Sequence, residues 1–271
     1  MFDATEQGIR IVSHSEAIQR LAREFWRIAK VPHDPPTKTF LEKCQSRTIE
    51  VNGKFHEYYQ SGTGPTVLLV HGVHSNLGSM VPIAETLLEQ DYQVVLFDAP
   101  SHGEASGTST DPVEVSRLIR AMYDRLTDLH AVVCHSLGGL WALAAWNNDV
   151  RAKTLVSISS PATMTFLVDK FVEMAKIDGD QVPELVRQLE GRVGEGVWTE
   201  YSPSEAVKTI SIPGLIIHGT SDDFIPQEHA ERLHSRWDRS TLELIQDARH
   251  FDILRSPEVR KIISAYLQEV M

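Results

Sequence analysis

The chain has 271 residues, of which 42% are apolar, and it carries a formal net charge of −11. This acidic balance argues against a nucleic-acid-binding surface, because phosphate recognition depends on lysine and arginine contacts. Two cysteines are too few for a disulfide framework, and no apolar run approaches the about 20 residues that a membrane-spanning helix needs. The first residues lack the basic start of a signal peptide, so we expect a soluble, cytoplasmic protein.

The first organised segment runs from about Ser15 to Lys30, where apolar residues recur at helical spacing with arginines between them. Pro32 ends this helix, and the prolines that follow predict an irregular linker. Residues 1–46 are therefore interpreted as an N-terminal helix and linker. We expect the amphipathic helix to dock either on its own domain or on a second subunit, and the second case would give a homodimer. Contact with a membrane is the alternative.

The middle of the chain alternates strand-like and helix-like segments. Residues 48–51 and 55–59 flank Asn52-Gly53, a dipeptide that favours a two-residue hairpin turn. Later apolar runs without polar alternation are typical of parallel strands buried on both faces. These runs cover residues 67–70, 94–97, 131–134, 155–158 and 215–217. The pattern predicts an α/β protein with a doubly wound, mostly parallel sheet, on which ligands bind beyond the carboxyl ends of the strands.

Residues 161–203 interrupt this alternation with two helix-like stretches. We therefore divide the domain into a core, residues 47–160 and 204–271, and a small helical cap. The apolar face of the first stretch includes Met164, Leu167 and Phe171. Such a stripe mostly packs, but we expect these three residues to contact substrate as well.

One strand-like run stops abruptly at a serine. Residues 134–138 read CHSLG, and a helix-like segment follows. This strand–serine–helix sequence resembles the nucleophile elbow of the α/β-hydrolase family, G-x-S-x-G, with Cys134 in place of the first glycine. We expect Cys134 to be a buried packing residue beneath the nucleophile, because it is small enough for the tight turn. An ordinary strand-to-helix turn is the alternative that this motif alone leaves open.

A serine hydroxyl is a weak nucleophile, so it needs a histidine to accept its proton and a carboxylate to orient that histidine. The resemblance implies the order serine, carboxylate, histidine. Residues 219–226 read GTSDDFIP and resemble the family's G-x-x-D-x-x-x-P loop, which selects Asp222 over Asp223. His250 follows a strand-like run at 242–245, in RHF where the family has GHF. The implied triad is Ser136, Asp222 and His250.

Two further loops resemble family motifs. Residues 70–75 read VHGVHS and resemble the oxyanion loop, which implies that the backbone amides of Val73 and Leu137 bind the oxyanion. The loop that starts at Asp98 resembles D-x-x-G-H-G-x-S with Ser101 in place of glycine, so Asp98 and His102 are assigned to structure. The remaining candidates for substrate contact are Val73, His74, His135 and Phe251.

His71 and His74 form an H-x-x-H pair, a spacing that can belong to a metal site. We expect none, since the chain has no H-E-x-x-H motif and no cysteine cluster. His71 is interpreted as a buried histidine that braces its loop. No glycine-rich phosphate cradle is present either.

The resemblance covers the chain from about Thr48 to Val270 and is closest to capped bacterial hydrolases of the esterase type. It implies cofactor-free hydrolysis of a small carboxylic ester through an acyl-enzyme intermediate. A serine nucleophile disfavours the chemistry of haloalkane dehalogenases and epoxide hydrolases. The alternatives are a thioesterase or C–C bond hydrolase with the same triad, and a catalytically silent binding module.

Overall fold

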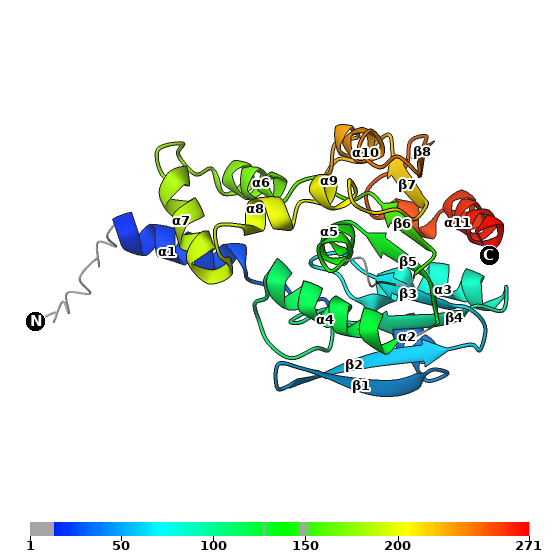
Figure 1. Ribbon diagram of the computed structural model, residues 1–271. Helices are drawn as coiled ribbons and strands as arrows, with labels where there is room; N and C mark the ends of the chain where they lie inside the picture. The colour runs from blue at the N-terminus through cyan, green and yellow to red at the C-terminus, as the bar shows by residue number, and fades with distance from the viewer. Residues whose placement is uncertain (1–13, 127, 147–149, 151, 271) are drawn as a thin grey trace, which may run out of the picture.

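The computed structural model describes residues 14–126, 128–146, 150 and 152–270, so the first thirteen residues of the predicted N-terminal segment lie outside the described part. Within it, eight strands form one sheet in the order β1-β2-β4-β3-β5-β6-β7-β8 (Figure 1). Their bounds are β1 Gln45–Val51, β2 Lys54–Ser61, β3 Thr66–Val70, β4 Gln93–Phe97, β5 Leu129–His135, β6 Thr154–Ile158, β7 Gly214–Gly219 and β8 Ser240–Ile245. Strands β3 to β8 are mutually parallel, which confirms the predicted fold class.

The predicted hairpin is confirmed at one edge of the sheet. Strands β1 and β2 pair antiparallel, and β2 joins β4 antiparallel. Asn52 and Gly53 both have positive φ, 52° and 74°, as a two-residue turn that matches the strand twist requires.

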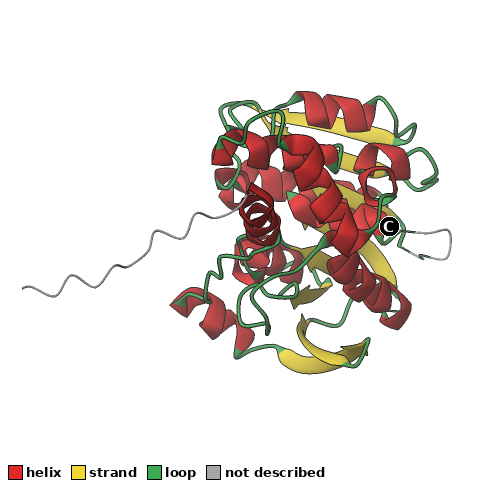
Figure 2. Ribbon diagram, turned by 90° about the vertical axis from the view of Figure 1, so that its left-hand side faces the viewer, coloured by secondary structure: helices red, strands yellow, loops and turns green. Residues whose placement is uncertain are grey.

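Helices lie on both faces of the sheet (Figure 2). On β5, Val132 and Cys134 face one core, and Ala131 and Val133 face the other, because successive side chains of a strand point in opposite directions. The first core also contains α4 Pro112–Arg125, α5 Leu137–Ala144 and α10 Glu228–His234; the second contains α3 Val81–Leu88 and α11 Pro257–Glu269. Two short 3-10 helices, η1 Leu77–Met80 and η2 Asp252–Arg255, also contribute to the second core.

Four helices lie between β6 and β7, three of them in the segment predicted as a cap, residues 161–203, and the fourth beginning at its last residue. They are α6 Thr165–Ala175, α7 Val182–Val193, α8 Val197–Glu200 and α9 Pro203–Ala206. Helix α9 packs against α5, so this insertion sits over the carboxyl end of β5. None of the helices in the described residues is long and apolar enough to span a membrane.

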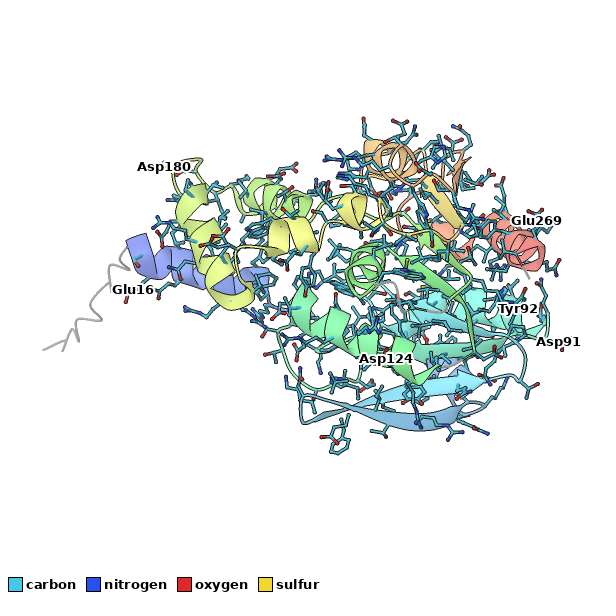
Figure 3. All side chains as sticks on the ribbon, in the orientation of Figure 1. Glu16, Asp91, Tyr92, Asp124, Asp180 and Glu269 are labelled. Carbon is cyan, nitrogen blue, oxygen red and sulfur yellow. The ribbon has the colours of Figure 1, made fainter. Side chains whose placement is uncertain are left out.

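The N-terminal helix, α1 His14–Phe25, docks on its own chain. Its buried residues Ile18 and Ala22 share a core with Leu185 and Leu189 of α7, and the two helices are in contact. Figure 3 shows Glu16 on α1 and Asp180 just before α7 at the same end of the molecule. A homodimer through α1 would therefore have to use its polar face.

The expectations for residues 26–41 were wrong in two respects. Helix α1 ends at Phe25, not near Lys30, because the backbone of Trp26 and Ile28 bonds to the loop after β4. The predicted irregular linker contains α2, Pro35–Leu41, which Asp34 caps by accepting a hydrogen bond from the Thr37 amide at 2.9 Å. Its prolines stand in the first turn of a helix, where the missing N–H is not needed.

A buried ion pair holds the segment between α1 and α2 to the core. His33 Nε2 lies 2.7 Å from Asp98 Oδ2, with side chains 3% and 7% exposed. The hydrogen bond to Asp98 raises the pKa of His33. Burial would raise the pKa of Asp98, but the bonds from His33 and from the amides of Leu77 and Glu104 lower it. Both groups are therefore charged together over a range of mildly acidic pH.

This pair predicts a pH-dependent effect of His33→Asn. The contribution of His33 is fully present below its ordinary pKa of 6.5 and is lost as the pH rises through the raised folded-state pKa. The contribution of Asp98 is present above 3.8 and is lost as the pH falls through its lowered pKa. In urea titrations we expect His33→Asn to lower the free energy of unfolding by about 3 kcal/mol at about pH 5.5, and by less at about pH 9.

The matched control is His234→Asn, at an exposed histidine of α10. We expect it to change the free energy of unfolding by less than about 0.5 kcal/mol at both pH values. Equal losses for His33→Asn at the two pH values would contradict the ion pair.

Candidate active site

Ser136 stands alone between β5, which ends at His135, and α5, which begins at Leu137. Its backbone has φ 54° and ψ −129°, a conformation that residues other than glycine rarely adopt. The Ser136 amide donates to the carbonyl of Ile158 on β6 at 2.9 Å, which ties the turn to the neighbouring strand. The strained turn is the geometry of a nucleophile elbow.

Small side chains make this turn possible. A Cβ atom at Gly138 would lie 2.6 Å from the carbonyl oxygens of Val70 and His71, so a larger residue would push α5 away from the end of β3. Cys134 is fully buried, and its thiol donates to the Val156 carbonyl at 3.2 Å. Burial raises the pKa of this thiol. Cys134 therefore packs beneath the turn, as expected, and is not a nucleophile.

The structure brings the three predicted triad residues together. His250 Nε2 lies 3.0 Å from Ser136 Oγ, and His250 Nδ1 lies 2.8 Å from Asp222 Oδ2. The side chains of His250 and Asp222 are 2% and 1% exposed. Because the carboxylate only accepts, Nδ1–H donates to Asp222, which leaves Nε2 to accept from the serine hydroxyl. This arrangement fits removal of a proton from Ser136.

The loop after β7 fixes Asp222 in its charged form. Burial would raise the pKa of Asp222, but the hydrogen bond from His250 and the amides of Phe224 and Ile225 lower it to about 2. Those amides donate to Oδ1 at 3.0 and 2.8 Å. Asp223, in contrast, is exposed and pairs with Arg249, the residue that replaces the family's glycine.

Two buried histidines support the loops that carry the triad. His135 Nε2 donates to the backbone carbonyl of His250 at 2.9 Å, and the two rings lie 4.8 Å apart. Burial lowers the pKa of His135 to about 3, so its ring is neutral. His218 Nε2 donates to the carbonyl of Ile225 at 2.9 Å, within the loop of Asp222.

Two backbone amides are available beside Ser136. Leu137 is the first residue of α5, so its amide has no partner inside the helix. In the described part of the chain, neither this amide nor that of Val73 bonds to an acceptor. A Cβ atom at Gly72 would lie 2.8 Å from Ser136 Cβ, so only glycine lets the Val73 loop come this close.

The histidines assigned to structure are buried and bonded to backbone. His71 Nδ1 donates to the Gly72 carbonyl at 2.7 Å, and Nε2 accepts from the Ala99 amide at 2.9 Å. His102 Nδ1 donates to the Pro100 carbonyl at 3.0 Å, and burial lowers its pKa to about 3. Among the described residues, no group of three or more histidine, cysteine, aspartate or glutamate side chains is placed to hold a metal ion.

A cavity of about 210 Å³ adjoins the turn. Its lining includes Val73 and Leu137, so it lies next to Ser136, and most of its other side chains are apolar. Of the predicted contact residues, Val73, His74, Leu167 and Phe171 line it.

Three predicted contact residues lie outside this cavity lining. Met164 is fully buried ahead of α6, where its amide donates to Ser202 Oγ at 3.0 Å. His135 lies beneath His250, because its ring bonds to that residue's backbone. Phe251 is 60% exposed, with its ring edge-on to His250 at 4.8 Å.

Sequence reasoning missed much of the cavity wall. Phe25, Trp26 and Ile28 reach it from the N-terminal segment, and Phe224 from the Asp222 loop. The adjacent aromatic residues at positions 25 and 26 were a signal, but local periodicity does not say which distant element an aromatic pair will meet.

Comparisons with known proteins identify the family of this fold. The model described as "Alpha/beta hydrolase family" matches residues 67–260, more than half of the chain. An uncharacterized Escherichia coli O157:H7 protein, YfhR, is 27% identical over 77% of this chain and 75% of its own. A pimeloyl-[acyl-carrier protein] methyl ester esterase of Pseudoalteromonas atlantica is 35% identical over 36% of this chain and 38% of its own.

A solved structure of an esterase from Pyrococcus furiosus has a similar fold. It superposes with a TM-score of 0.70 at 18% identity, over 91% of this chain and 97% of that one. With residues 67–260 matched and the parallel sheet, elbow turn and loops arranged as described, the chain belongs to the α/β hydrolase family.

Proposed function

We propose that this protein is a serine hydrolase that cleaves carboxylic esters through a Ser136–His250–Asp222 triad and an acyl-enzyme intermediate. The observation that carries the proposal is a single buried imidazole placed between Ser136 Oγ, at 3.0 Å, and Asp222 Oδ2, at 2.8 Å. An imidazole held in this way accepts the serine proton as the hydroxyl attacks.

The chemical steps follow from these positions. Ser136 Oγ attacks the acyl carbon while its proton moves to His250 Nε2, and Asp222 stabilises the imidazolium that forms. The amides of Val73 and Leu137 donate to the oxyanion. His250 then gives its proton to the departing alkoxide, and water, deprotonated by His250, attacks the acyl-enzyme. The acid leaves and Ser136 regains its proton.

The cavity beside Ser136 supports an ester with an apolar acyl group. Its lining includes six aromatic side chains, those of Phe25, Trp26, Trp141, Phe166, Phe171 and Phe224. Apolar cavities bind apolar groups because the contact removes both surfaces from water. The similar Pseudoalteromonas and Pyrococcus proteins are both esterases by name, which also favours an ester substrate. Acyl-CoA thioesters and diketones are the comparison substrates, since the same triad would serve them.

We also propose a cytoplasmic location, where thiols stay reduced. Cys44 and Cys134 are both free in the structure.

The first test removes the nucleophile. We expect Ser136→Ala to lower kcat for p-nitrophenyl acetate or butyrate by at least about 10⁴-fold, because the substitution removes the hydroxyl that forms the acyl-enzyme. Ser235→Ala, at an exposed serine after α10, is the matched control and should keep the parent rate. Parent-level hydrolysis by Ser136→Ala would refute the triad.

The second test compares two neighbouring carboxylates. Asp222→Asn should lower kcat by about 10³- to 10⁴-fold with little change in KM, because the amide no longer favours the required tautomer of His250. Asp223→Asn removes only the exposed ion pair with Arg249, so kcat should stay within about twofold. If the two variants lost activity equally, Asp222 would not be the orienting carboxylate.

A further inference from the structure

We propose that residues 25–33, here called the N-terminal strap, form one wall of the cavity beside Ser136 and set the length of the hydrophobic group that this cavity accepts. The inference rests on the proposed function and assigns a specificity role to residues outside the 67–260 match and ahead of the sheet. Figure 1 shows this stretch leaving α1 and crossing to the core beside the insertion between β6 and β7.

Three strap side chains line the cavity. Trp26 and Ile28 are 6% and 8% exposed, and Phe25 is half-buried. The ring of Phe25 meets that of Phe171 on α6 edge to face, with centroids 5.2 Å apart. The strap and α6 therefore form two of the cavity's walls, and Phe25 lies where these two walls touch.

The strap is fixed to the loop that follows β4. The Ile28 amide donates to the Thr108 carbonyl at 3.0 Å, and the Thr110 amide donates to the Trp26 carbonyl at 3.1 Å. These two hydrogen bonds flank Arg27 and pair it with Ser109 in an isolated antiparallel bridge, which holds the backbone extended at this point. The side chains of Trp26 and Ile28 consequently have a set direction toward the cavity lining.

A second set of bonds joins the strap to the loop that carries the Val73 amide. The Ala29 amide donates to His74 Nδ1 at 3.2 Å, and Asn76 Nδ2 donates to the carbonyls of Val31 and Pro32 at 2.9 and 3.2 Å. The strap is thus positioned relative to the same loop that approaches Ser136. The wall that the strap forms therefore lies at a fixed distance from the reacting atoms. A wall at a fixed distance limits the length of the acyl chain that fits in the cavity.

The ion pair of His33 with Asp98 attaches the last residue of the strap to the core. It lies at the far end of the strap from Phe25, and both side chains are buried. The strap is therefore anchored along its whole length to the core, whereas α6 belongs to the insertion. Changing a cavity-facing side chain of the strap should reshape the cavity without moving the triad.

The test varies Phe25 and the acyl chain together. With p-nitrophenyl acetate, butyrate, octanoate and dodecanoate, Phe25→Ala should raise the ratio of kcat/KM for dodecanoate over butyrate by at least about tenfold, because methylene groups gain room in the cavity. Phe25→Trp should lower the same ratio by filling that room. The parent and both variants are each assayed at a temperature the same number of degrees below their own thermal unfolding midpoint.

Phe55→Ala is the matched control, because Phe55 is 72% exposed on the hairpin. It should leave the ratio within about twofold of the parent. A ratio that is unchanged in both Phe25→Ala and Phe25→Trp would overturn the strap's role, even with the ester hydrolysis intact.

A binding assay separates this inference from the proposed function. Octanoate and dodecanoate are titrated into the parent and Phe25→Ala proteins, and tryptophan fluorescence is followed. Phe25→Ala should shift the relative affinity toward dodecanoate. If this shift is seen but no ester is cleaved, the hydrolase proposal fails and the strap's role stands. Identical relative affinities in the two proteins would contradict the strap's role.

Discussion

The buried imidazole of His250 is the constraint on which the rest of the site depends. It needs a carboxylate on one nitrogen and a hydroxyl on the other. The imidazole, the carboxylate and the hydroxyl follow β8, β7 and β5, respectively. Only a parallel sheet brings the carboxyl ends of these strands to one edge. The strain at Ser136, the close approach of Gly72 and the burial of Asp222 all serve this one arrangement.

Neutral histidines support this arrangement from beneath. His135 bonds to the backbone of His250, His218 to the loop of Asp222, and His71 to the loop of Gly72. Burial lowers the pKa of each, so none adds a positive charge that would compete with the His250 imidazolium for Asp222. A buried neutral ring can donate to a carbonyl and keep its shape, which suits a group that must hold a loop in place.

The sequence predicted what depends on local pattern. Unalternating apolar runs located the parallel strands, Asn52-Gly53 located the hairpin turn, and the order of motifs selected three residues that meet in space. It failed where a residue's role depends on distant partners. The prolines at residues 35 and 36 predict an irregular linker but begin α2, and the strap's aromatic pair does not reveal in the sequence which distant elements it meets around the cavity.

The misplaced contact residues have the same origin. A helical stripe does not reveal which member faces a cavity, so Met164 was grouped with Leu167 although it is fully buried. His135 follows the strand period, which places it beneath the nucleophile and against His250. Periodicity predicts burial well, but it does not distinguish a packed face from a binding face.

The most direct measurement of the triad is covalent labelling. A fluorophosphonate probe reacts with a serine only when a base removes its proton and oxyanion donors are in place. Digestion and mass spectrometry of the labelled protein should show one adduct, on Ser136, and none after Asp222→Asn at the same exposure time. A parent protein that stays unlabelled, or an adduct on another serine, would contradict the mechanism.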